Sequence, residues 1–187
     1  MPETLYRRIE SPLGPLILAG DGTALTALLF SSGRQARPAD PQWTPAPAAF
    51  TEASWQLAAY FAGELKQFSL SLAPRGTDFR QLVWQGLQRI PFGRTMTYAA
   101  LAAEIGRPKA VRAVGAANGA NPLPIVIPCH RLVAGNGDLT GFGGGLEAKA
   151  FLLRLEGHRV TQRAARYRID PEASGALRAH IRSPKAS

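Results

Sequence analysis

The chain has 187 residues, 45% of them hydrophobic, and 22 Lys and Arg residues against 13 Asp and Glu residues give it a net charge of +9. This length allows one ordinary domain or two small ones, and no apolar run approaches the roughly 18 residues of a membrane span. The N-terminus lacks a secretory signal, and a single cysteine excludes a disulfide framework and a cysteine-rich zinc site. We therefore expect a cytoplasmic protein with no metal and no cofactor, whose basic charge suits a polyanionic partner such as nucleic acid.

The first part of the chain, residues 1–75, is predicted to be a small α+β module. Apolar and β-branched residues separated by turn-forming sequences predict three short strands, at 5–10, 14–19 and 24–30. After a loop rich in Pro, Arg and Ala, mixed helical spacings of apolar residues predict a helix over 50–63, with Thr51 as a candidate N-cap. The segment 68–75 is either a strand or an extended linker, and this part shows no catalytic constellation.

The second part, residues 76–160, is predicted to be mostly helical. Apolar stripes predict four helices, at about 77–89, 97–105, 108–117 and 146–156. Gly106 ends the second of these and Pro108 is suited to the first position of the third, so the two have the outline of a helix-turn-helix. A basic tail, residues 161–187, is expected to follow and to be partly disordered.

The second helix of this pair is built almost entirely from small residues. Between 110 and 117 only Arg112 has a long polar side chain, and Lys109 comes just before it. A helix that reads bases in the major groove needs several long hydrogen-bonding side chains on one face. If DNA is the partner, we therefore expect minor-groove contact with little sequence preference. Close packing against the protein's own core is the alternative.

The single cysteine follows an apolar run at 125–127, which predicts the end of a buried strand. Pro128 interrupts the strand because it has no N–H, and Cys129 and His130 come next. A thiol beside an imidazole is a candidate nucleophile with its base, although a lone cysteine is more often a small buried apolar residue. Arg131 adds a positive charge that we expect to favour the thiolate.

A glycine-rich segment, residues 140–145, follows the cysteine motif. Its four glycines around Phe142 predict a mobile flap that carries a stacking residue. A phosphate-binding loop is the rival interpretation, but no Gly-Lys-Ser/Thr sequence follows the glycines. Phe142 as an ordinary core residue is the other alternative.

Taken in order, these motifs resemble the methylated-DNA–protein-cysteine methyltransferases, the O6-alkylguanine-DNA alkyltransferases that repair alkylated bases directly. The motifs that carry the resemblance are Tyr98, Pro108-Lys109-Ala110-Val111-Arg112-Ala113-Val114-Gly115, Asn121-Pro122, Ile127-Pro128-Cys129-His130-Arg131, Gly144-Gly145 and Glu156-Gly157. The resemblance covers roughly residues 77–160, and residues 1–75 fit that family's ribonuclease-H-like module more loosely. It implies a two-part α+β fold, in which the second part is mostly helical and holds a short active-site strand.

The resemblance also implies a reaction. An alkyl group would pass from O6 of guanine in duplex DNA irreversibly to Cys129 after the base has been flipped out, and each molecule would react once. His130 would take the thiol proton through a water and Glu156 would orient His130. Tyr98 would hydrogen-bond the flipped guanine, and Asn121 would fix the turn between the DNA-binding helix and the site. The protein would act as a monomer, and O4 of thymine stays open as a second substrate.

Two further groups of residues follow from the resemblance. Arg112 would enter the base stack in place of the flipped nucleotide. The residues expected at the DNA are Lys109, Arg112, Ala113 and Gly115. The residues expected to line the substrate pocket are Leu132, Phe142, Gly143 and Gly144. Phe142 stands where that family often has a tyrosine, and Gly143 has no side chain, so the range of accepted alkyl groups stays open.

Three other functions compete with this interpretation. A damage sensor of the same fold would bind the flipped base without accepting the group, but Cys129 argues against it. A transcription regulator would need more base-reading side chains than the small-residue helix offers. A cysteine hydrolase could use Cys129, His130 and Glu156, but it would leave Arg112 and the basic charge unexplained.

Overall fold

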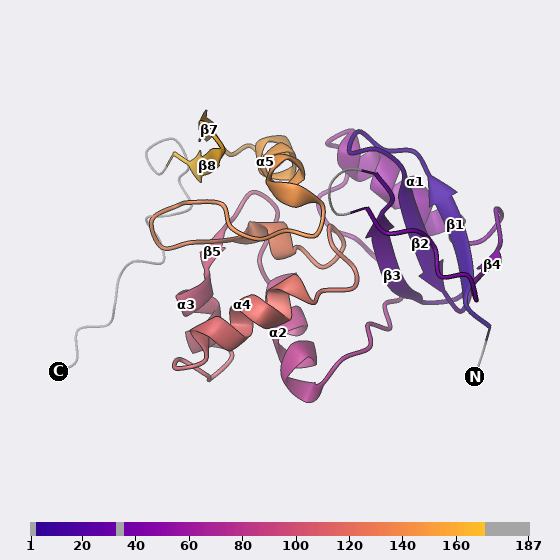
Figure 1. The fold of residues 1–187 in the computed structure, drawn as a ribbon, viewed down its shortest axis with the longest axis horizontal. Helices are drawn as coiled ribbons and strands as arrows, with labels where there is room; N and C mark the ends of the chain where they lie inside the picture. Colours follow the sequence, from indigo (N-terminus) through magenta and orange to yellow (C-terminus); the bar gives the residue numbers. More distant parts are fainter. Residues whose placement is uncertain (1–2, 33–35, 171–187) are drawn as a thin grey trace.

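The computed structural model describes residues 3–32 and 36–170, which form two parts packed against each other (Figure 1). The N-terminal part is a four-stranded sheet with one helix, and the C-terminal part contains four helices and two short strand pairs. The predicted two-part α+β fold is therefore confirmed. No helix in the described ranges is long and apolar enough to cross a membrane.

The N-terminal sheet has the strand order β3-β2-β1-β4. The three predicted strands are confirmed as β1 (Leu5–Ile9), β2 (Leu16–Gly20) and β3 (Leu25–Phe30), which pair antiparallel, while β4 (Thr44–Pro45) pairs parallel with β1. Every residue of β2 is buried, because this strand lies between two others and is covered on its faces. The sheet thus places its most apolar strand at the centre.

Helix α1 (Thr51–Phe61) confirms the predicted helix and packs its buried side chains, including Leu57 and Tyr60, into the same core as β2. The N-cap prediction for Thr51 is wrong, because Thr51 is the first helical residue and Phe50 precedes it with φ 56°. The Thr51 hydroxyl donates to the carbonyl of Ala48 at 3.1 Å, so it is turned away from the helix N–H groups that a cap would serve.

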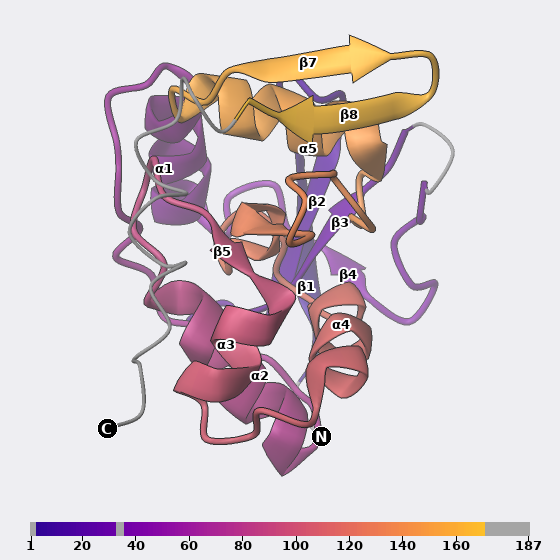
Figure 2. The same cartoon turned by 90° about the vertical axis from the view of Figure 1, so that its left-hand side faces the viewer.

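The C-terminal part contains α2 (Asp78–Gln88), β5 (Met96–Thr97), α3 (Tyr98–Glu104), α4 (Val111–Gly119), β6 (Leu132–Val133) and α5 (Gly145–Leu155). Thr77 and Thr97 cap α2 and α3 by accepting from backbone N–H groups of the first turn. Helices α3 and α4 form the predicted helix-turn-helix pair, and Figure 2 shows both beside α2. The predicted start of α4 at Pro108 is wrong, since a turn closed by Ala110 N–H to the Arg107 carbonyl comes first.

The apolar segment 125–127 is buried, but it is not a strand. Ile125 has φ 76°, and the N–H of Ile127 donates to the Leu123 carbonyl at 2.8 Å, so the segment is a tight turn. Pro124 and Pro128 flank it, and since proline has no N–H, the segment cannot pair along its length. The strand near the cysteine is β6, which follows a single 3₁₀ turn over Cys129–Arg131 and pairs parallel with β5.

The chain continues into a hairpin of β7 (Val160–Arg163) and β8 (Arg166–Ile169). This hairpin lies over α5, with Val160 and Ile169 packed in a second apolar cluster with residues of α5 (Figure 2). The predicted start of the basic tail at residue 161 therefore falls inside an ordered element. The rest of the predicted tail, residues 171–187, lies outside the described residues.

Candidate active site

Cys129 is the first residue of the 3₁₀ turn and is almost fully buried. Its N–H donates to the Ile127 carbonyl at 2.7 Å, which fixes the backbone at the point where the apolar turn ends. Burial raises the pKa of the thiol to about 11, although a hydrogen bond from Asn121 and the positive charge of Lys149 partly oppose this. The resting thiol is thus protonated, and reaction with an electrophile requires a base.

His130 follows Cys129 in the chain, and its side chain is held by a carboxylate. Its Nε2 atom is 2.8 Å from Glu156 Oε1, and both side chains are fully buried. Burial lowers the pKa of the imidazole, although Glu156 acts in the opposite direction. A neutral ring that donates from Nε2 to Glu156 carries its lone pair on Nδ1, an atom without a hydrogen bond to any described residue. This tautomer is suited to accept a proton at Nδ1.

Glu156 is the C-cap residue of α5 and the centre of a buried polar cluster. Its carboxylate accepts hydrogen bonds from Tyr60 Oη at 2.8 Å, from Arg131 Nη2 at 2.9 Å and from the Gly93 N–H at 3.2 Å. Burial alone would raise the pKa of this carboxyl, but the hydrogen bonds and charges of His130 and Arg131 lower it to about 2. Glu156 is therefore a carboxylate at neutral pH.

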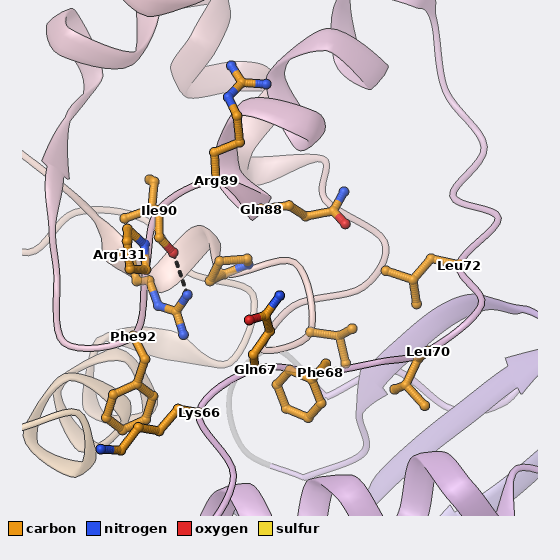
Figure 3. A pocket seen from close by; sticks show the side chains of 13 residues that line it. Lys66, Gln67, Phe68, Leu70, Leu72, Gln88, Arg89, Ile90, Phe92 and Arg131 are labelled. Atoms are coloured by element: carbon orange, nitrogen blue, oxygen red, sulfur yellow. Dashed lines mark hydrogen bonds between the residues drawn. The ribbon is translucent and has the colours of Figure 1, made fainter.

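The Arg131 side chain points toward Glu156, with its Nε 3.0 Å from Oε2, and its Nη1 donates to the Ile90 carbonyl at 2.6 Å (Figure 3). The expectation that Arg131 favours the Cys129 thiolate is wrong, because its charge is paired with Glu156 and the thiol pKa is raised. Figure 3 shows the guanidinium beside a pocket of about 460 Å³ between the segment that leaves α1 and the end of α2.

Tyr60 is a site residue that the sequence analysis did not identify. It lies on α1 in the N-terminal part, its ring packs against Phe61, Phe68 and Phe92, and its hydroxyl reaches Glu156. Nothing in its local sequence distinguishes it from the other aromatic residues of a helix stripe. Only the packing of the two parts brings it to the site.

Lys149, on α5, is a further buried charged residue, and its charge acts on the Cys129 thiol. Its ammonium donates to the Leu132 carbonyl at 2.6 Å and to the Thr140 carbonyl at 2.7 Å. Burial lowers the pKa of this amine to about 8. Lys149 thus joins the strand after the cysteine motif to the start of the glycine-rich segment.

An open pocket of about 510 Å³ lies between α3, α4 and the loop that follows β6. Tyr98, at the start of α3, lines it and accepts a hydrogen bond from Thr140 Oγ1 at 3.0 Å. Gly115 of α4 lies behind the tyrosine ring, where a Cβ would be 3.9 Å from the nearest ring carbon. The lining residues are Thr97, Tyr98, Ala99, Val111, Arg112, Gly115, Ala134, Gly135, Thr140 and Gly141.

Two family models match the two parts of the chain. One, described as the ribonuclease-like domain of 6-O-methylguanine DNA methyltransferase, matches residues 4–74, and the other, described as its DNA binding domain, matches residues 78–158. A protein of Methanosarcina acetivorans named methylated-DNA–protein-cysteine methyltransferase is 51% identical over 152 residues, which are 81% of this chain and 97% of that protein.

This chain belongs to the methylated-DNA–protein-cysteine methyltransferase family.

Solved structures of the family agree. The crystal structure of Mycobacterium tuberculosis OGT in complex with DNA has a TM-score of 0.78 and 52% identity, and the match covers 82% of this chain and 93% of that one. The methyltransferase from Pyrococcus kodakaraensis is more distant, with a TM-score of 0.61 and 25% identity over 82% of this chain. The same fold is therefore found in relatives of about half and about a quarter sequence identity to this chain.

In this family member, α4 has two different sides. Val114 and Ala117 are buried in the core, whereas Arg112 and Ala113 are exposed, as is Lys109 just before the helix. The two alternatives for this helix therefore describe opposite sides of it. Val114 and Ala117 pack inward, and Arg112 lines the open pocket.

Asn121 ties together the turn that leads from α4 to the cysteine. Its Nδ2 donates to the Ile127 carbonyl at 2.8 Å and its Oδ1 accepts from the Leu123 N–H at 3.0 Å. The amide also forms a hydrogen bond with the Cys129 thiol. Asn121 thus connects the end of the helix-turn-helix to the thiol.

The glycine-rich segment differs from its prediction. Phe142 is buried, with its ring edge-on to Phe30 at 5.6 Å and to His130 at 6.2 Å, which favours the alternative that it is a core residue. None of the predicted pocket residues Leu132, Phe142, Gly143 and Gly144 lines the open pocket, which is bordered instead by Thr140 and Gly141. Within the described ranges, no three His, Cys, Asp or Glu side chains form a metal-binding group.

Proposed function

We propose that this chain repairs DNA by moving an alkyl group from O6 of guanine in a duplex to Sγ of its own Cys129. The proposal is supported by membership of a family whose curated relatives are named methylated-DNA–protein-cysteine methyltransferase and by the DNA complex of a relative. The observation that carries it is the buried arrangement of Cys129, His130 and Glu156, in which His130 is fixed at Nε2 and open at Nδ1.

The first step is removal of the thiol proton. Burial keeps the Cys129 thiol protonated and His130 neutral, so proton transfer through a water to Nδ1 of His130 creates the nucleophile at the moment it is needed. The imidazolium that forms is next to the Glu156 carboxylate, which offsets its charge.

The second step is a single displacement at the alkyl carbon. A bond forms between Sγ and this carbon while the bond from the carbon to O6 breaks, and the electron pair passes to the purine. Tyr98 donates a hydrogen bond to a ring nitrogen and so stabilises the negative charge on the departing guanine, which then takes up a proton. The products are guanine and S-alkylcysteine.

The base must leave the duplex to reach the site, because O6 inside the stack cannot approach a buried thiol. The open pocket beside α4 is large enough for a purine, and Arg112 at its edge enters the stack to replace the flipped nucleotide. The residues that contact the DNA are Lys109, Arg112, Ala113 and Gly115. These contacts read no base edge, so affinity depends on salt and hardly on sequence.

Each molecule acts once. The product thioether is a poor leaving group, and no second thiol exists in this chain to remove the alkyl group, because Cys129 is its only cysteine. We further propose that the protein works as a monomer in the cytoplasm, where its thiol stays reduced. O4-alkylthymine is a second candidate substrate.

Intact-protein mass spectrometry tests this function. The protein is incubated with excess duplex that contains one O6-methylguanine, and the modified residue is located by peptide mapping. One methyl group on Cys129, with no further reaction and none in Cys129→Ser, is the expected result. An unchanged mass with tight binding to the lesion would identify a damage sensor, and an unchanged mass without binding would overturn the proposal.

A further inference from the structure

Thr140 is held on both of its sides. Its Oγ1 donates to Tyr98 Oη at 3.0 Å, and its carbonyl accepts from Lys149 Nζ at 2.7 Å. The same ammonium donates to the Leu132 carbonyl at 2.6 Å. Hydrogen bonds on either side of Thr140 therefore connect the strand that follows Cys129 with Tyr98, which lines the open pocket.

The inner end of this connection is rigid. Lys149 is fully buried, and an ammonium in that position needs both carbonyls, because an unpaired buried charge costs several kcal/mol. Leu132 directly follows the 3₁₀ turn that contains Cys129. The backbone of Thr140 is therefore fixed relative to the thiol, even though its side chain is exposed.

At the other end, the hydrogen bond from Thr140 determines where the hydroxyl hydrogen of Tyr98 points. A tyrosine hydroxyl can donate one hydrogen bond and also accept, and its hydrogen rotates to suit its surroundings. When the hydroxyl accepts from Thr140, its own hydrogen is directed to another acceptor.

We propose that Thr140 is a positioning residue of the transfer reaction, which holds the Tyr98 hydroxyl as a donor toward the flipped base. This inference rests on the proposed function, in which Tyr98 donates to the purine. Burial raises the pKa of Tyr98, and the hydrogen bond from Thr140 acts against that rise and improves the hydroxyl as a donor. Thr140 touches no reacting atom and works through Tyr98.

The test compares transfer rates under single-turnover conditions with saturating O6-methylguanine duplex. Thr140→Val keeps the shape and the backbone carbonyl but removes the hydroxyl, and we expect transfer to slow about fivefold while duplex affinity changes less than about twofold. Thr140→Ser restores the hydroxyl and should return the rate to within about twofold of the wild type. Thr161→Val, on the exposed β7 strand, is the matched control and should have no effect.

A double-mutant cycle with Tyr98→Phe separates positioning from a general structural effect. If Thr140 acts through the tyrosine hydroxyl, Thr140→Val should slow the Tyr98→Phe protein no further. In addition, the ¹³Cζ resonance of Tyr98 should shift in Thr140→Val while that of Tyr167 stays in place. These two readouts remain informative if the valine variant proves less stable.

The outcomes are distinguishable. The role of Thr140 is overturned if Thr140→Val transfers the methyl group at the wild-type rate. It is also overturned if Thr140→Val slows transfer equally in the wild type and in Tyr98→Phe. Either result leaves the proposed function intact. A full rate for Tyr98→Phe removes the role of Tyr98 and that of Thr140 with it. A wild-type protein whose Cys129 stays unmodified overturns the proposed function itself.

Discussion

The Tyr60 hydroxyl donates a 2.8 Å hydrogen bond to Glu156 Oε1, although 96 positions separate the two residues in the sequence. The N-terminal part thus supplies one of the donors that hold the carboxylate behind His130. Tyr60→Phe should destabilise the protein by about 2 kcal/mol, because a buried charged acceptor loses a partner. Urea unfolding measures this loss, and Tyr6→Phe, on β1, is the control for removing a hydroxyl away from the site. Equal stability of the wild type and Tyr60→Phe would contradict the prediction.

Arg131→Lys should be strongly destabilising, even though it preserves the charge. Lysine cannot reproduce the contacts of the guanidinium with both oxygens of Glu156 and with the Ile90 carbonyl, so we expect a loss of about 3 kcal/mol. The matched control is Arg89→Lys, because the pair of Arg89 with Glu104 is largely exposed and should contribute about 1 kcal/mol at most. Chemical denaturation of both variants under the same conditions makes the comparison, and similar losses would refute it.

The free energy of unfolding should decrease in two stages as the pH is lowered. The pKa values of His130 and Glu156 are lower in the folded protein than their ordinary values of 6.5 and 4.5, so the unfolded chain binds more protons at both groups. The contribution of each group to stability is therefore complete when the pH is above the ordinary pKa of that group. It is lost as the pH falls toward the pKa of the group in the folded protein. Urea unfolding at pH 7, 5.5 and 3.5 should show this decline, and Glu156→Gln should show a weaker decline between pH 5.5 and 3.5. If stability declined more steeply in Glu156→Gln than in the wild type, Glu156 would not be the source of the decline.

Without DNA, Cys129 should react slowly with thiol reagents. A pKa raised to about 11 by burial, against an ordinary value of 9.0, lowers the thiolate fraction at neutral pH by about a hundredfold. Alkylation by iodoacetamide at pH 7.5, followed by mass spectrometry of the only cysteine, should therefore be at least that much slower than in urea-unfolded protein. Comparable rates for the folded and unfolded protein would indicate a thiol that is already activated.

Arg112→Ala should slow the reaction with duplex DNA much more than the reaction with the free base. If Arg112 replaces the flipped nucleotide, its loss should slow transfer from duplex about tenfold or more and change transfer from free O6-methylguanine base less than about twofold. Arg163→Ala removes an equal charge from the hairpin strand β7 and should leave both reactions unchanged. Single-turnover assays on the two substrates make this comparison, and equal losses on both would refute the stacking role.

The periodic elements of this fold could be predicted from the sequence. The three N-terminal strands and helices α1, α2, α3 and α5 all lie close to their predicted ranges, because their apolar spacing matches the face that each one buries. The pairing of His130 with Glu156 was also predicted, through the resemblance, and the structure places these two side chains 2.8 Å apart.

The errors come from segments where local pattern and tertiary environment disagree. Residues 125–127 have the composition of a strand, but the flanking prolines and the positive φ of Ile125 make them a turn. The direction of the Arg131 side chain depends on a carboxylate 25 positions away, which no local pattern reveals. The burial of Phe142 depends on Phe30 of the N-terminal sheet. The sequence could therefore not predict contacts between residues that lie far apart in the chain, such as Arg131 with Glu156 and Phe142 with Phe30.

The contact of Tyr60 with Glu156 also limits how this gene can recombine with those of its relatives. A chimera that joins the first part of one family member to the second part of another at about residue 75 changes the neighbours of the buried carboxylate. In such a chimera, Glu156 keeps all of its hydrogen bonds only if helix α1 of the other family member has a donor at the position of the Tyr60 hydroxyl. The two parts therefore depend on each other through the side chain of Tyr60.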